Sequence, residues 1–534
     1  MAGRWRIRRW GWGVVAMLAC IAGSSAAWPQ AVPPRPETAA AARGQAARSI
    51  RETYLAAARS EGPANLPIGV FDSGTGGLAV LEQILRLDRF DNATRSPRPG
   101  GDGRPDFEAE RFLFLADQAN MPYGNYPAAG RGAFLVDLIL HDVAFLLGNQ
   151  YSRHARTAEL CRDKLPAKHI VIACNTATAH GKRHIAALLD LAEIDVRVVD
   201  VIEAGAHSAV EAIGGKRATI GVLATKGTAD SGAYPAAIEA LARQQGIGPL
   251  TVVQQGSVGL AGAIDGVREF LLPGARGPRP DYRGPSLDHP AARIDAAILP
   301  RYAFDFAEGH MLWQGDQARP AVLQINSVGN YVAYEVVSLL EAVRGQSPPD
   351  PLAAVVLGCT HFPYYAGAFR RELQRLYDYQ EGGQYVYRRL MAPEVRCLDP
   401  AVMTARQLYL RLSADGKLRA PRSHQENNNN KVRGEFYVTV PNPDWPGVEL
   451  DSGGGFTYTY KYGRSSGGLE ARDVRVVPLT TRFFDAATAR RLEQQLPAVW
   501  RLLSDFTACS SQAPPGNSRE GCWTPKTGPA DKAE

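Results

Sequence analysis

The chain has 534 residues, of which 45% are hydrophobic, 8% aromatic and 21% charged. These fractions are typical of a soluble globular protein with a large core, and they exclude collagen, wholesale disorder and a multi-span membrane protein. The formal charge is +6, and it falls to +2 without the four arginines among the first 27 residues. A body this close to neutral has no electrostatic footprint for nucleic acid.

The first 27 residues are typical of an export signal. An Arg-rich start precedes a short apolar stretch at 14–22 and small residues that end at Ala27. The apolar stretch is too short to span a bilayer. We therefore predict a signal peptide over 1–27 and a periplasmic or secreted protein without a stable membrane span after cleavage. A retained membrane anchor and lipid attachment at Cys20 remain open as alternatives.

After this signal the chain changes from a leader to a regular alternation. Residues 28–65 are expected to be a Pro- and Ala-rich leader with a surface helix around 39–59. Short apolar runs followed by helix-forming segments then occur at 68–71, 111–115, 169–173, 196–199, 219–223 and 353–357. Repeated strand–helix units predict an α/β fold with a mostly parallel sheet, whose ligands bind at the carboxyl ends of the strands.

Three segments have the composition of insertions into this alternation. They are rich in Gly, Pro, Asp, Arg or Asn and lie at about 91–108, 268–320 and 414–480. Within the last one, alternating apolar and polar residues at 435–440 and 456–460 predict an exposed hairpin.

The C-terminal region is expected to hold one more helix and a tail. Asp485 is a good N-cap, and the helix is predicted to end near Leu503. The residues from 506 to 534 have the composition of a polar tail. In an oxidising compartment Cys509 and Cys522 are the most plausible disulfide.

Two of the apolar runs end in similar polar segments. Val171-Ile172-Ala173 leads into Cys174-Asn175-Thr176, and Val356-Leu357-Gly358 leads into Cys359-Thr360-His361. This internal similarity predicts two related halves that face each other across a cleft. Each cysteine could instead be a small core residue. However, buried polar neighbours need hydrogen-bond partners, so polar strand ends more naturally line a ligand cleft.

The first strand is followed by a Gly-rich turn, Asp72-Ser73-Gly74-Thr75-Gly76-Gly77. Together with Ala79, this turn satisfies a loose dinucleotide-binding fingerprint. That interpretation requires an acidic residue about 20 positions later, at the end of a second strand. Asp88 and Asp91 instead flank a helix end and a loop, which disfavours a nucleotide site.

Five motifs, in this order, resemble glutamate racemase: Asp72-Ser73-Gly74-Thr75-Gly76-Gly77-Leu78, Pro122-Tyr123-Gly124, Ala173-Cys174-Asn175-Thr176-Ala177, Thr225-Lys226-Gly227-Thr228 with Ser231-Gly232-Ala233-Tyr234, and Leu357-Gly358-Cys359-Thr360-His361. The resemblance covers roughly residues 66–410. It implies a cofactor-independent amino-acid racemase that needs no metal. It also implies two pseudo-symmetric domains, each built on a parallel sheet, that face each other across a central cleft.

The resemblance implies roles for four catalytic residues. Asp72 would assist Cys174, and His361 would assist Cys359. Two thiols on opposed walls suit a racemase, because one must remove the Cα proton from one face while the other returns a proton to the opposite face. The family's second-half carboxylate corresponds to Asp265, and this departure leaves the preferred substrate open.

Substrate contacts are also implied by the resemblance. Hydroxyl and main-chain N–H groups can bind carboxylates without placing a full positive charge beside each thiol. The implied contacts are Ser73, Tyr123, Gly124, Asn175, Thr176, Thr228 and Thr360. Asp117 precedes the loop that carries Tyr123. It could orient that loop, or it could be a solvated side chain.

The expected domain organisation places a first racemase domain at 66–200, a second at 201–395 and a return to the first at 396–505. We expect a small-molecule enzyme that interconverts L- and D-glutamate or a related acidic amino acid, and family resemblance suggests a homodimer. The resemblance implies a family whose members usually supply D-glutamate in the cytoplasm, whereas this chain is expected to be exported from the cytoplasm. Two other classes remain open: a periplasmic binding or regulatory protein without turnover, and a one-thiol lyase or isomerase of the same superfamily.

Overall fold

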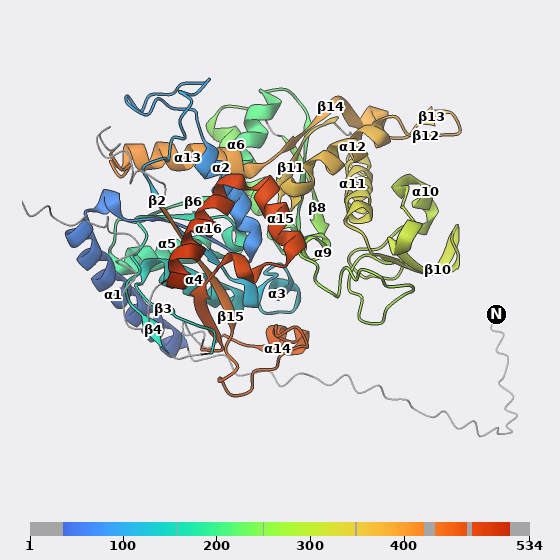
Figure 1. Cartoon of the computed structure of the whole chain (residues 1–534). Helices are drawn as coiled ribbons and strands as arrows, with labels where there is room; N and C mark the ends of the chain where they lie inside the picture. The colour runs from blue at the N-terminus through green and yellow to red at the C-terminus, as the bar shows by residue number, and fades with distance from the viewer. Residues whose placement is uncertain are drawn as a thin grey trace, which may run out of the picture. The chain divides into compact units, whose positions relative to one another are not determined.

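Two parallel sheets, with helices on both faces of each, make up the body of the protein (Figure 1). The computed structural model describes residues 36–156, 159–248, 250–347, 350–420, 433–466 and 472–512. The predicted signal peptide and the partner of the expected Cys509–Cys522 disulfide lie outside these residues. Within them, no helix combines the length and the apolar character that a membrane span requires.

The first sheet has six strands in the order β16-β15-β2-β1-β5-β6. Neighbouring strands run parallel, except that β16 is antiparallel to β15. The strands are β1 (Ile68–Asp72), β2 (Arg111–Ala116), β5 (His169–Ile172), β6 (Arg197–Asp200), β15 (Arg433–Pro441) and β16 (Val474–Pro478).

The second sheet has four parallel strands in the order β14-β11-β7-β8. They are β7 (Thr219–Thr225), β8 (Thr251–Ser257), β11 (Leu352–Gly358) and β14 (Met391–Leu398). All six apolar runs expected from the sequence are strands of these two sheets. The predicted α/β class with two parallel sheets is therefore confirmed.

Helices fill the connections between the strands. Their bounds are α1 (Pro36–Glu61), α2 (Leu78–Arg86), α3 (Asn125–Ala128), α4 (Gly132–Leu147), α5 (Asn175–Ala192), α6 (Val201–Ile213), α7 (Lys226–Asp230), α8 (Ala233–Gln244), α9 (Leu260–Ile264), α10 (Leu299–Tyr302), α11 (Val328–Arg344), α12 (Ala366–Tyr377), α13 (Pro400–Ala414), α14 (Tyr458–Gly463), α15 (Ala486–Gln495) and α16 (Pro497–Gln512). The described residues also contain three short antiparallel strand pairs: β3 (Tyr151–Ser152) with β4 (Leu160–Cys161), β9 (Met311–Asp316) with β10 (Arg319–Ile325), and β12 (Gln380–Glu381) with β13 (Gln384–Tyr385).

Alternating side chains give each sheet two apolar faces, because successive residues of a strand point to opposite sides. In β1, Val70 packs into a cluster with α2, α13 and α16, whereas Phe71 packs into a cluster with α1, α4 and α5. In β7, Leu223 packs toward α11 and Val222 packs toward α6 and α8. Each sheet is thus a central layer with apolar side chains on both faces. Polar side chains that act on a ligand are therefore expected at the ends of the strands.

The prediction of an exposed hairpin at 435–440 and 456–460 is wrong. Residues 433–441 form β15, which lies between β2 and β16 inside the first sheet. Phe436 and Tyr437 are both fully buried, one on each face of the sheet. The second run largely becomes helix α14. Alternation predicted a strand correctly, but it does not identify the partner, and the partner β2 is far away in the sequence.

The polar tail begins later than residue 506. Two helices, α15 and α16, replace the single helix expected from Asp485 to about Leu503, and α16 continues to Gln512. Phe506 is only 1% exposed, and its ring lies 6.0 Å from the rings of both Phe436 and Tyr437. Figure 1 shows α16, in red, crossing the first sheet.

Phe506→Ala is therefore expected to lower the free energy of unfolding by about 3–5 kcal/mol, because it leaves a cavity between α16 and β15. Chemical denaturation followed by circular dichroism measures this loss. Phe483→Ala is the matched control, since that side chain is 44% exposed, and it should change stability by less than about 0.5 kcal/mol. Equal effects of the two substitutions would contradict the packing described for α16.

Candidate active site

A small cleft lies where the carboxyl ends of β1, β5, β7 and β11 meet. Its volume is about 30 Å³. It is lined by Asp72, Ser73, Met121, Pro122, Tyr123, Gly124, Cys174, Asn175, Thr176, Thr225, Ala261, Gly262, Asp265, Cys359, Thr360 and His361. Strands β1 and β5 belong to the first sheet, and β7 and β11 to the second. One cysteine from each sheet therefore borders the same space.

Cys174 lies two residues after the end of β5 and caps the N-terminus of α5. Its sulfur accepts a hydrogen bond from the Ala177 N–H at 3.4 Å and lies 3.7 Å from Ser73 Oγ. The residue is 5% exposed. Burial raises the pKa of the Cys174 thiol well above its usual value, the negative charge of Asp72 raises it further, and the Ala177 and Ser73 contacts oppose the shift. At neutral pH Cys174 is consequently a thiol, that is, a proton donor.

Asp72 ends β1 and is 1% exposed. Its Oδ2 accepts hydrogen bonds from the Gly77 N–H at 2.6 Å and from Thr360 Oγ1 at 3.3 Å. Burial raises the pKa of this carboxyl, while the charge of His361 and the contact with Cys174 partly counteract the rise. Asp72 therefore touches groups from both sheets.

The Gly-rich turn allows the two halves to approach closely. A Cβ atom on Gly76 would lie 2.6 Å from His361 Cε1, and one on Gly77 would lie 2.5 Å from Asp72 Cβ. Both contacts are far too short for real atoms. The glycines are thus needed for close packing around the carboxylate and the imidazole.

Cys359 follows β11 and is paired with an imidazole. Its sulfur lies 3.6 Å from His361 Nδ1, and His361 Nε2 lies 2.8 Å from Asp265 Oδ2. Burial lowers the pKa of His361, but the ion pair with Asp265 and the contact with Cys359 together raise that pKa well above its usual value. The carboxylate, imidazole and sulfur form a continuous chain, and His361 is protonated at neutral pH.

Three threonine hydroxyls join the two sheets beside the thiols. Thr176 Oγ1 lies 3.0 Å from Thr225 Oγ1 and 3.1 Å from Thr228 Oγ1, and the latter two lie 3.0 Å apart. Thr225 was not among the site residues expected from the sequence, although it begins one of the motifs and ends β7. Thr228 is fully buried and does not border the cleft, so it supports the other two hydroxyls from behind.

Asn175 and Tyr123 border the cleft, but their side chains are partly engaged elsewhere. Asn175 Oδ1 accepts a hydrogen bond from the buried Tyr234 hydroxyl at 2.6 Å. The Tyr123 hydroxyl lies within hydrogen-bond distance of both Asp117 and Asp142. Since it has one hydrogen, one of the two carboxyl groups must hold a proton. Burial raises the pKa of Asp142 well above its usual value, and the charge of Asp117 adds to this.

Asp117 orients the loop that carries Tyr123. It is 1% exposed and accepts hydrogen bonds from Asn120 and from Thr439 of β15, the latter at 2.7 Å. The alternative of a solvated Asp117 is wrong. Because Thr439 lies more than 300 residues away along the chain, the sequence alone gave no sign of this contact.

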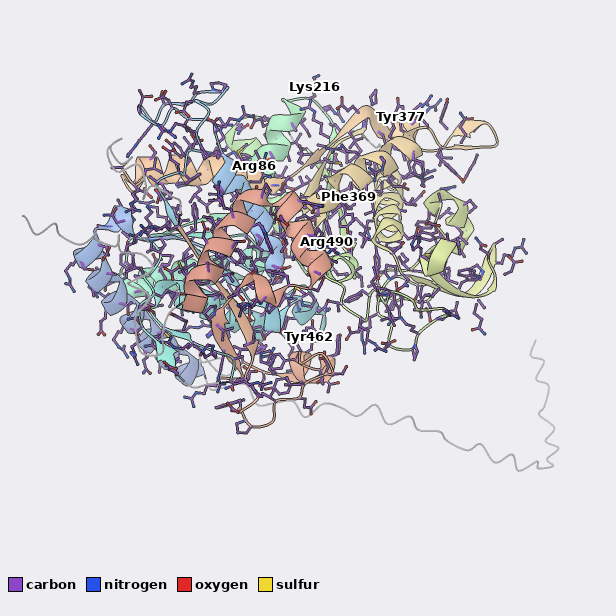
Figure 2. All side chains as sticks on the ribbon, in the orientation of Figure 1. Arg86, Lys216, Phe369, Tyr377, Tyr462 and Arg490 are labelled. Carbon is purple, nitrogen blue, oxygen red and sulfur yellow. The ribbon has the colours of Figure 1, made fainter. Side chains whose placement is uncertain are left out.

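Helix α14 holds the same loop from outside. Lys461 Nζ donates to the Met121 carbonyl at 2.7 Å, and Asn125 Nδ2 donates to the Tyr462 hydroxyl at 3.2 Å. Tyr462, labelled in Figure 2, also packs against the ring of Tyr126. One of the inserted segments therefore positions a wall of the cleft.

Sequence comparison relates this chain to glutamate racemases, although no family model matches it. The glutamate racemase of Limosilactobacillus fermentum is 35% identical over 215 residues, which are 39% of this chain and 63% of that protein. The enzyme of Thermus thermophilus is 36% identical over 170 residues, which are 32% of this chain and 47% of that protein. The matches thus span about half to three fifths of the relatives' own length.

Solved structures of glutamate racemases also align with this chain. A glutamate racemase isoform from Bacillus anthracis aligns with 70% of this chain and 88% of its own, at 20% identity and a TM-score of 0.40. One from Francisella tularensis, in complex with D-glutamate, aligns with 76% and 97% at 17% identity and a TM-score of 0.37. The sequence matches carry the relationship: over the matched segment, this chain is homologous to the glutamate racemases.

Proposed function

We propose that this chain is a cofactor-independent racemase that interconverts the L and D forms of an acidic amino acid such as glutamate. The observation that carries the proposal is the pair of cysteines, Cys174 and Cys359, that border one cleft from two different sheets. Each sulfur has its own polar partner, Asp72 on one side and His361 with Asp265 on the other. The homology to glutamate racemases supports the same activity.

The proposed reaction is a proton transfer at each face of Cα. One sulfur, as a thiolate, takes the Cα proton and becomes a thiol. The electron pair left on Cα is delocalised into the substrate carboxylate. The opposite thiol then gives its proton to the other face of Cα and becomes a thiolate. No atom is lost or gained overall, and only the configuration of Cα is inverted.

The surroundings of the two sulfurs favour different starting states. Burial and the negative charge of Asp72 keep Cys174 protonated. A protonated His361 stands beside Cys359, and a neighbouring cation stabilises negative charge on sulfur. We infer that, in one direction of turnover, Cys174 gives its proton to Cα and Cys359 takes the proton from the opposite face. The opposite direction of turnover requires the two roles to be exchanged.

Neutral donors are proposed to hold the substrate. The hydroxyls of Ser73, Thr176 and Thr225 border the cleft together with the main chain of Gly124. These groups can bind a carboxylate through hydrogen bonds. Asn175 keeps its amide hydrogens for the same purpose, because its oxygen is already bonded to Tyr234.

Incubation of the purified protein with L-glutamate or L-aspartate in deuterated water tests the proposal. A racemase is expected to produce the D enantiomer and to place deuterium at Cα, which chiral chromatography and mass spectrometry detect. A binding protein would raise the melting temperature with ligand but leave Cα protiated. A one-thiol lyase would release an elimination product. Either of these two outcomes would overturn the proposal.

We further propose that the enzyme works outside the cytoplasm, because residues 1–27 have the composition of an export signal. Cell fractionation and the N-terminal mass of the mature chain test this proposal, and a start at Trp28 is expected. In the exported protein, once it is unfolded without a reductant, a small alkylating reagent should label both Cys174 and Cys359 as free thiols. Recovery of the full-length chain in the cytoplasm would contradict the export.

A further inference from the structure

A second and larger cavity adjoins the catalytic cleft. Its volume is about 270 Å³, against about 30 Å³ for the cleft. We call it the vestibule, and it is lined among others by Phe270, Arg283, His289 and Tyr458. The two cavities adjoin, because five residues border both: Pro122, Gly124, Thr225, Ala261 and Gly262. The vestibule is therefore the larger space beside the cleft that holds the thiols.

Two inserted segments build the outer part of the vestibule. Arg283 and His289 come from the segment at 268–320, and Tyr458 is the first residue of α14. The guanidinium of Arg283 lies 4.2 Å from the centre of the Tyr458 ring. The insertions thus meet beside the catalytic cleft through a cation–aromatic contact.

The backbone at Arg283 is held firmly on both sides. The Arg283 N–H donates to the Glu269 carbonyl at 2.9 Å. The hydroxyl of the preceding Tyr282 accepts a hydrogen bond from the Ile325 N–H at 3.1 Å. A Cβ atom on the following Gly284 would lie only 2.2 Å from the Tyr331 hydroxyl oxygen. Such anchoring fixes the position of the Arg283 backbone at the vestibule.

The positive charge of Arg283 is not matched by the protein. Among the residues that the structure describes, no carboxylate lies within 4.0 Å of its guanidinium. The vestibule's other permanent cation, Lys226, is paired with Asp230 at 2.7 Å. Arg283 is therefore the group in the vestibule that is available to an anion.

His289 offers a neutral donor in the same cavity. Its Nδ1 accepts hydrogen bonds from the N–H groups of Ala291 and Ala292 at 3.1 and 2.8 Å. The ring hydrogen consequently lies on Nε2. Burial lowers the pKa of His289, although the charge of Asp288 opposes this shift. The imidazole is thus neutral at pH 7 and does not compete with Arg283 for the anion.

We propose that the vestibule receives the side chain of the substrate and that Arg283 binds an anionic group at its end. The substrate class is then α-amino acids whose side chains are longer than that of glutamate and end in a carboxylate. The vestibule has about nine times the volume of the cleft, which leaves room for a side chain longer than the five heavy atoms of the glutamate side chain. This inference rests on the proposed racemase function.

Kinetics with a graded series of substrates test the inference. We expect kcat/KM to rise from L-glutamate through L-2-aminoadipate to L-2-aminopimelate. Arg283→Gln should lower kcat/KM for 2-aminopimelate by at least about tenfold, mainly through KM, because it removes a charge-assisted hydrogen bond. The neutral L-2-aminoheptanoate should be affected less than about twofold. Arg293→Gln is the matched control, since Arg293 is an exposed residue of the same segment outside the vestibule.

Equal effects of Arg283→Gln on the acidic and neutral substrates would overturn the inference, and so would a preference for glutamate over the longer acids. Arg283→Lys should restore part of the preference. A binding measurement separates this inference from the proposed function. With Cys174→Ser protein, 2-aminopimelate should raise the melting temperature more than 2-aminoheptanoate, and Arg283→Gln should abolish the difference. If that pattern occurs while no amino acid is racemised, the vestibule assignment stands and the racemase proposal fails.

Discussion

Cys174→Ser and Cys359→Ser are each expected to lower the racemisation rate at least about a thousandfold, because proton transfer by a positioned side chain contributes roughly 10²–10⁴ to a rate. A serine hydroxyl has nearly the shape of the thiol, but it does not ionise near neutral pH. Chiral chromatography of the product at saturating substrate measures the loss. The melting temperature should change little, since neither sulfur makes a contact that an oxygen cannot replace.

Cys397→Ser is the matched control for these two variants. Cys397 lies in β14, is partly buried and does not border the cleft. Its substitution should leave the rate within about twofold of the original. Full activity of either Cys174→Ser or Cys359→Ser would refute the assignment of two thiols.

Asp265→Asn is expected to shift the pH dependence of kcat/KM. Burial lowers the pKa of His361, and in the native protein Asp265 outweighs that effect and keeps the imidazole protonated. Without the carboxylate the imidazolium loses its proton at a lower pH. The alkaline limb of the profile should therefore move to lower pH, and kcat/KM at pH 8 should fall roughly a hundredfold. Rates measured between pH 5 and 10 test this shift.

The ion pair between His361 and Asp265 also has a predictable effect on stability. The pKa of His361 is higher in the folded state than in the unfolded state. The contribution of His361 to the free energy of unfolding is therefore fully present below the unfolded pKa, and it is lost as the pH rises through the folded pKa. Asp265→Asn should remove that contribution, and the two proteins should become more alike in stability at alkaline pH. Glu239→Gln is the control, because Glu239 forms an exposed pair with Arg243 and borders neither cavity. An unchanged pH profile in Asp265→Asn would contradict the proposed role of the carboxylate.

Much of the fold was predictable because its strands are short apolar runs with distinct boundaries. The pair of cysteines was also predictable, since each directly follows such a run and carries polar neighbours. In a parallel sheet the carboxyl ends of strands lie at one edge, so Asp72 and Cys174, which lie at the ends of the neighbouring strands β1 and β5, could be expected to meet.

Contacts between distant segments could not be predicted in this way. Alternation indicated a strand at 435–440, but only the structure identifies β2 as its partner. Similarly, Thr228 has the same motif context as Thr225, yet Thr225 alone borders the cleft. The vestibule depends on the meeting of Arg283 with Tyr458, and the alternation around Tyr458 predicted a strand where the structure has helix α14.

The isotopic content of the first product formed in deuterated water tests the central claim most directly. The reaction starts from a protiated L-amino acid and is stopped at low conversion. Two monoprotic thiols predict a D product that carries deuterium at Cα in nearly every molecule, while the remaining L substrate is still protiated. A D product that retains the original hydrogen would mean that one group serves both faces, which would contradict the account.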